Sequence, residues 1–105
     1  MSYLGSGEIY FEQCDSDSQN VDTTGGTLAA LFTNLSFVAG REVILRNRVP
    51  AAGSNAANIL IGKTAAAARF RILPGEAFSL RPRDLAKVAI KSDAGTQVVD
   101  VFLVV

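Results

Sequence analysis

The residue types that most often carry out covalent chemistry are scarce in this chain, which has one cysteine, Cys14, and no histidine. The lack of histidine removes the most common general base and every Ser-His or Cys-His arrangement. Cys14 itself lies between Glu12 and Asp15, and neighbouring negative charge disfavours the thiolate that a nucleophile requires. We therefore expect no catalytic residue and no enzymatic activity.

Two short motifs suggest phosphate or calcium binding, but neither is complete. Gly62-Lys63-Thr64 matches the end of a phosphate-binding P-loop, whereas the glycine that must begin this motif is replaced by Ala57. An EF-hand loop beginning at Asp15 would need a glycine where Asn20 stands and a glutamate where Gly26 stands. We predict no cofactor, no small-molecule substrate and no regular metal site, which leaves only an irregular cation site open at these acids.

The chain has zero net charge, but its charges are unevenly distributed. Residues 1–40 contain five acidic residues and no lysine or arginine, and all ten basic residues lie between Arg41 and Lys91. Such a layout either has no functional meaning or brings the acidic segment onto a basic surface. That surface would belong to the same chain or to a neighbouring subunit.

A single all-β domain is the architecture that the size and the pattern favour. The chain has 105 residues, of which 49% are hydrophobic and 19% charged, so it can bury one core. From Val21 onward, short apolar stretches alternate with turn formers, as in β-sandwiches. We expect a β-sandwich or jelly-roll-like domain at residues 21–105 and an acidic N-terminal arm at residues 1–20. The predicted strands include Thr27–Phe32, Glu42–Asn47, Asn58–Gly62, Val88–Ser92 and Gln97–Val105, with connectors at Thr64–Ala68 and Pro82–Ala86.

The arm combines three large side chains with polar ends. Ile9, Tyr10 and Phe11 lie within a strand-like run, Glu8–Glu12, whereas Cys14–Asn20 is polar and rich in turn formers. A free arm would leave the three large side chains in water. We therefore predict that they are covered by another element or by another chain.

The stretch Arg69–Arg81 carries the clearest local pattern. Pro74 and Gly75 supply the backbone angles of a type II turn at its second and third positions. The residues on either side alternate, as strands with one buried face do. The inner face would hold Phe70, Ile72, Phe78 and Leu80, and the outer face Arg69, Arg71, Ser79 and Arg81. We predict a β-hairpin whose arginines cluster on its outer surface.

The last strand, Gln97–Val105, is apolar on both faces. Val99, Val101, Leu103 and Val105 share one face, and on the other face only Asp100 interrupts Val98, Phe102 and Val104. Strands that are apolar on both faces are usually covered on both. Either another subunit or the folded-back arm would therefore cover Phe102 and Val104.

The arginine cluster admits two interpretations. Clustered arginines can contact nucleic acid, but the chain has no net positive charge and no outward aromatic residues between them. Arginine also suits protein interfaces through its planar, multidentate contacts, and we favour this alternative. No run of 18 apolar residues is present, so we predict neither a membrane span nor a secretory signal.

The order of these motifs resembles small β-sandwich structural proteins of tailed-bacteriophage virions, of the capsid decoration (cement) or head-associated kind. The resemblance covers roughly residues 21–105 and departs from its typical pattern at Thr64–Ala68, where four alanines replace a more polar or aromatic segment. The motifs that carry it are Val21–Thr27, Val43–Asn47, Ile59–Gly62, Leu73–Glu76, Asp84-Leu85 and Gly95-Thr96, followed by the valine-rich last strand.

The resemblance implies a non-enzymatic virion protein, made in the host cytoplasm and located on the capsid surface. Its partners would be the major capsid protein and other copies of itself, with a trimer favoured. Ile9, Tyr10 and Phe11 of the arm and Arg69, Arg71 and Arg81 are the expected capsid contacts, with Phe102 and Val104 expected for self-association. The alternatives are a head-tail connector, tail or vertex-fibre base protein, and a module that binds carbohydrate or the host surface.

Overall fold

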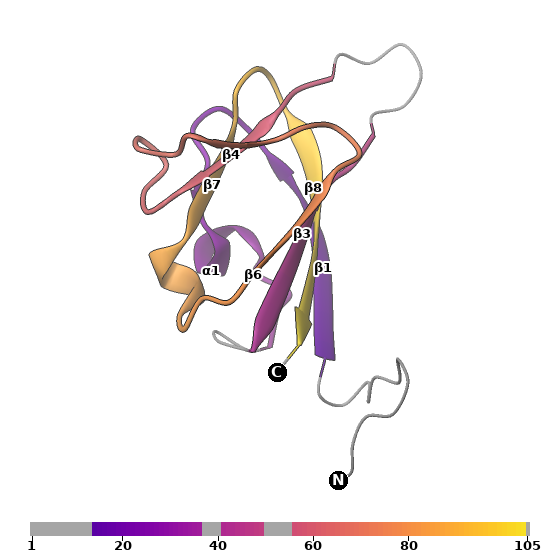
Figure 1. Cartoon of the computed structure of the whole chain (residues 1–105), viewed down its shortest axis with the longest axis vertical. Coiled ribbons are helices and arrows are strands. Elements are labelled where there is room, and N and C mark those ends of the chain that lie inside the picture. Colours follow the sequence, from indigo (N-terminus) through magenta and orange to yellow (C-terminus); the bar gives the residue numbers. More distant parts are fainter. Residues whose placement is uncertain (1–13, 37–40, 50–55, 105) are drawn as a thin grey trace, which may run out of the picture.

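The computed structural model describes residues 14–36, 41–49 and 56–104. They form two four-stranded antiparallel sheets, which confirms the predicted all-β, sandwich-like fold (Figure 1). Sheet A has the order β1-β8-β3-β6 and sheet B the order β2-β7-β4-β5. The strands of sheet A are β1 (Cys14–Val21), β8 (Gln97–Val104), β3 (Glu42–Asn47) and β6 (Ala77–Leu80). Those of sheet B are β2 (Gly26–Thr27), β7 (Ala89–Ser92), β4 (Ile59–Gly62) and β5 (Phe70–Ile72).

The core lies between the two sheets and follows from their alternating sequences. Along β8 every second side chain is buried, as predicted for Val99, Val101 and Leu103. Sheet B contributes its own inward row, and removing these apolar surfaces from water is the main source of stability. The other buried core residues include Val43, Leu45, Ile59, Ile61, Ile72 and Ile90.

One end of the core is closed by two short helical turns. The expected strand at Thr27–Phe32 is wrong: Leu28–Leu31 forms a single helical turn, α1, because Thr27 accepts a hydrogen bond from the Ala30 N–H as its N-cap. The expected turn near Pro82–Ala86 is a 3₁₀ turn, η2, at Leu85–Lys87.

In the part of the chain that the structure describes, no helix has the length and apolar character needed to cross a membrane.

Residues Cys14–Asn20 belong to a strand, so the prediction of a polar, turn-forming segment there is wrong. They form most of β1, which pairs with β8 along its whole length. The sequence hid this strand because β1 is polar: it lies at the edge of sheet A, where pairing with the apolar β8 decides its conformation.

Two carboxylates of β1 close the free edge of this strand. Asp15 accepts hydrogen bonds from the N–H groups of Ser16 (2.9 Å) and Ser36 (2.5 Å). Asp17 accepts from the Ser18 N–H (2.8 Å) and from the Asn34 side chain (3.0 Å). Partial burial raises the pKa of Asp17, but these hydrogen bonds outweigh it and the pKa is lowered. The loop after α1 is thereby tied to β1.

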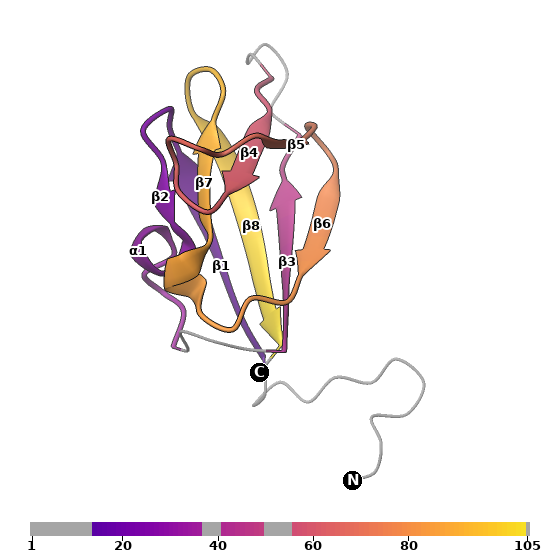
Figure 2. The ribbon, with the colours of Figure 1, turned by 60° about the vertical axis from the view of Figure 1, so that its left-hand side comes forward.

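The Pro-Gly turn forms as predicted, but it does not join a hairpin. The Glu76 N–H donates to the Leu73 carbonyl (2.9 Å), and Gly75 has a φ of 88°. However, β5 pairs with β4 and β6 pairs with β3, so the turn carries the chain from sheet B to sheet A (Figure 2). The hairpin prediction is therefore wrong, because pairing with distant strands separates β5 from β6.

Close backbone packing explains the glycine that ends β4. A methyl group on Gly62 would lie 2.6 Å from the Cα atom of Ala68 and 2.8 Å from the Ala67 carbonyl oxygen. The connector predicted at Thr64–Ala68 is confirmed as a turn, in which the Ala67 N–H donates to the Thr64 carbonyl (3.2 Å). The small residues of this turn can therefore pack directly against β4.

Candidate protein-binding face

The outer face of sheet A, which points away from the core, is the candidate functional surface. The registers align Ser16, Phe102, Ile44 and Ser79 in one row across the four strands. The next row holds Ser18, Asp100, Arg46 and Ala77. The sequence alternation puts these side chains opposite the buried ones, so apolar and charged groups share one surface.

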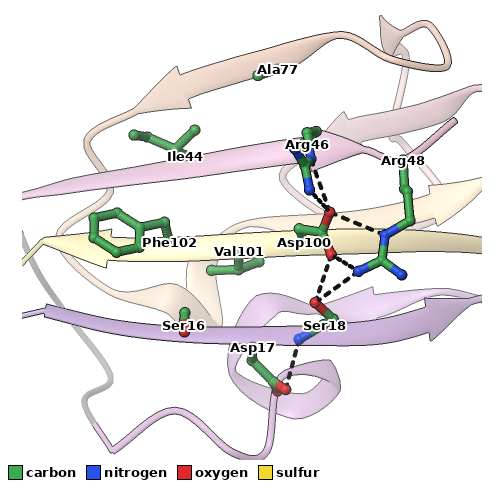
Figure 3. Close-up of a pocket in the computed structure, with 10 residues that line it drawn as sticks. All are labelled: Ser16, Asp17, Ser18, Ile44, Arg46, Arg48, Ala77, Asp100, Val101 and Phe102. Carbon is green, nitrogen blue, oxygen red and sulfur yellow. Dashed lines mark hydrogen bonds and ion pairs between the residues drawn. The ribbon is translucent and has the colours of Figure 1, made fainter.

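A shallow depression of about 420 Å³ crosses this face (Figure 3). Ile44 and Phe102 form its apolar part and are half-buried. At its other end the Asp100 carboxylate lies between the side chains of Arg46 and Arg48 (Figure 3). Its open shape and mixed lining suit contact with a protein surface.

Asp100 holds both arginines in place. Its Oδ2 accepts from Arg46 Nε (2.9 Å) and Nη2 (2.7 Å), and its Oδ1 accepts from Arg48 Nη2 (2.5 Å) and Ser18 Oγ (2.6 Å). The Asp100 side chain is only 16% exposed, whereas both arginines are about half exposed. The cluster therefore presents two fixed guanidinium groups to solvent with their charge partly neutralised.

The acidity of Asp100 follows from this cluster. Partial burial raises its pKa, but hydrogen bonds from Arg48, Ser18 and Arg46 outweigh burial and lower the pKa to about 2 from its ordinary value of 3.8. Since the folded pKa is the lower one, the ionised carboxylate stabilises the fold above about pH 4. This contribution is lost as the pH falls toward 2.

We expect the Asp100→Asn variant to lose this pH dependence. At pH 7 its free energy of unfolding should fall by about 1–2 kcal/mol, since the half-exposed arginines are screened by water. Between pH 4 and pH 2 wild-type protein should lose more stability than the variant, because only the wild-type protein has the Asp100 carboxylate to protonate. The contribution of Asp17 is the same in both proteins and cancels in the comparison. Urea unfolding at several pH values measures the difference, and parallel curves would contradict the role of the cluster.

The structure locates five of the eight predicted contact residues. Phe102 and Val104 lie on the outer face of sheet A and are half-buried. Arg69, Arg71 and Arg81 are exposed. Ile9, Tyr10 and Phe11 lie outside the described residues.

The predicted single cluster of Arg69, Arg71 and Arg81 is wrong. Arg69 and Arg71 alternate with the inward row of sheet B, whereas Arg81 follows β6 in sheet A, on the side of Ser79. The outer faces of the two sheets point in opposite directions, so these arginines do not form one outer surface.

Several surface residues were missed by sequence reasoning. Arg46 and Arg48 lie on either side of Asn47, and their alternation with Leu45 indicated an outward direction. Only the pairing of β3 with β8 brings them to Asp100.

Phe70 was expected to point into the core, but it is 53% exposed. In the described ranges no group of three or more His, Cys, Asp or Glu side chains could hold a metal ion.

The fold and this face are the structural evidence that bears on function. No protein-family model matches the chain, and no curated protein is significantly similar to it.

Proposed function

We propose that this chain is a structural protein of a tailed-phage virion that decorates the capsid and strengthens the lattice of the major capsid protein. The proposal combines the motif order, which resembles such proteins, with one structural observation. That observation is the outer face of sheet A, where Phe102 lies in the row next to Asp100 and the arginines that it holds, and Val104 lies one row further along. Aromatic and arginine side chains are enriched at protein interfaces.

The mechanism is non-covalent. The sandwich provides a rigid surface, because β3 and β8 are central strands of sheet A and support both rows of the outer face. Phe102 and Val104 lose water on contact, and Arg46 and Arg48 provide hydrogen bonds to carboxylates of the partner. Many modest contacts repeated over a capsid lattice give strong overall attachment.

Acidic substitutions on this face test the proposal. Phe102→Asp combined with Val104→Asp should weaken binding to shells of the major capsid protein at least tenfold, because charges replace the apolar contact. Co-sedimentation of purified protein with shells from the phage that encodes the chain measures binding. Leu60→Asp, on the outer face of sheet B, is the control and should bind normally.

Two outcomes would redirect the proposal. Equal binding by the double variant and wild-type protein would remove this face from the mechanism. Binding to a single vertex, rather than over the whole shell, would favour a connector or tail protein. Light scattering of the double variant also tests whether Phe102 and Val104 contribute to self-association.

A further inference from the structure

The apolar surface that most needs a partner lies at the corner between β5 and β6. Val49, Phe70 and Leu73 are 66%, 53% and 46% exposed and are the exposed large apolar side chains of the described residues. The Phe70 ring lies 4.6 Å from that of Phe78, and Gly75 packs against Val49. We call Val49, Phe70, Leu73 and Phe78 the β5–β6 corner. Concentrated apolar exposure of this kind marks interaction sites.

The corner also contains an open strand edge. β6 is the last strand of sheet A and β5 the last strand of sheet B. At the opposite edge of sheet A, Asp15 and Asp17 already bind the N–H groups of Ser16 and Ser18. Strand addition is therefore blocked at β1, whereas β6 can accept an extended segment.

We propose that residues 8–12 of a second copy bind this edge as an added strand and cover the corner. The segment has three large side chains, Ile9, Tyr10 and Phe11, between Glu8 and Glu12. The corner matches this pattern, because its apolar groups lie between basic residues of sheet B on one side and of sheet A on the other. Arg69 and Arg71 lie on either side of Phe70, Arg81 follows β6, and none of the three forms an ion pair with another described residue.

The geometry requires the segment to come from a second copy. Cys14 lies level with Glu42, since both pair with Val104, whereas β6, which borders the corner, begins at Ala77, opposite Arg46. A strand added beside β6 would lie four strand spacings, about 19 Å, from β1 across sheet A. Along the strands, the level of Arg46 lies about four residues, or about 13 Å, from the level of Cys14. The straight distance is about 23 Å. The five residues from Cys14 back to Ile9 reach at most about 18 Å.

This exchange predicts a closed ring of copies. The donated segment and the accepting corner are different surfaces, so each contact is head-to-tail, and such contacts close into rings when the rotation allows. A trimer satisfies this requirement. The inference goes beyond the proposed function, because it concerns contacts between copies of the chain. It is tested on purified protein without a capsid, so its failure would leave capsid binding untouched.

Mixing two complementary variants provides the test. One variant carries Ile9→Ser with Phe11→Ser, so it lacks the donor; the other carries Phe70→Ser, so it lacks the acceptor. Each variant alone should be monomeric in light scattering, because the dissociation constant of its self-association should rise at least tenfold. The mixture should form a one-to-one dimer, because the first variant keeps its corner and the second keeps its segment.

Each alternative result has a clear meaning. A monomeric wild-type protein, variants that remain oligomeric, or a mixture that stays monomeric would overturn the proposal. Circular dichroism checks that both variants fold. If Phe70→Ser does not fold, Leu73→Ser replaces it, since Leu73 lies in the exposed turn.

Discussion

Replacing Asn47 with alanine is expected to lower the free energy of unfolding by about 3 kcal/mol. Asn47 ends β3 in sheet A and is buried. Its side-chain amide donates to the carbonyls of Ala57 (3.0 Å) and Ile72 (2.9 Å). Ala57 lies just before β4, and Ile72 is the last residue of β5, so both acceptors belong to sheet B or its border. Alanine would leave both carbonyls buried without these donors, and each unpaired group costs about 1–3 kcal/mol. Part of this cost is offset, because alanine also removes the Asn47 Oδ1, which is buried without a hydrogen-bond partner among the described residues.

The matched control is Asn20→Ala, because Asn20 is an exposed residue of the edge strand β1. That substitution should change stability by less than about 0.5 kcal/mol. Asn47→Asp keeps the shape but replaces the donor with an acceptor, so it should destabilise at neutral pH at least as much as alanine. Urea unfolding measures all three variants. Equal midpoints for the Asn47→Ala and Asn20→Ala proteins would show that the amide does not join the sheets.

Replacing Gly25 with alanine is expected to destabilise the fold by about 3–4 kcal/mol, from two causes. Gly25 has a φ of 64°, and a methyl group there would lie 2.1 Å from the carbonyl oxygen of Ile90. That oxygen belongs to β7, which pairs with β2. The strand cannot move away without breaking this pairing, because the clash is with backbone.

Gly95→Ala separates the two causes. Gly95 has a φ of 61°, but a methyl group there meets nothing within 4 Å. Its substitution should therefore cost only the backbone strain, about 1–2 kcal/mol. Thermal unfolding of both variants measures the difference. A Gly25→Ala protein as stable as the Gly95→Ala protein would show that packing against Ile90 contributes nothing.

Sequence alternation predicted the elements whose conformation is set locally. Val99, Val101 and Leu103 alternate along β8 and are buried, because period-two burial is a property of any strand with one covered face. The turn at Pro74 and Gly75 was equally predictable, since its backbone angles depend on those two residues alone.

Long-range pairing decided what the sequence could not predict. The residues on both sides of the Pro-Gly turn would show the same alternation in a hairpin and in a crossover between sheets. The strand pairing distinguishes the two: Phe70 pairs with Ile61 in sheet B, and Phe78 pairs with Leu45 in sheet A. The cluster at Asp100 likewise joins residues more than 50 positions apart. Its signal was the single charge on an otherwise apolar strand face, which did not reveal its partners.

The exposed position of Phe70 has the same origin. Its alternation predicted an inward side chain, and it does stack on the half-buried Phe78. However, β5 and β6 are edge strands of their sheets, so no other strand of residues 14–36, 41–49 and 56–104 covers the gap between them. Local periodicity indicates the direction of a side chain but not what lies beyond the edge of the sheet.

A side-chain-resolution reconstruction of virions of the tailed phage that we propose to carry this protein would test the central claim most directly. We predict copies spread over the whole shell, with Phe102, Val104 and the arginine pair turned toward the major capsid protein. A shell that lacks the protein, or one on which this face points to solvent, would contradict the account.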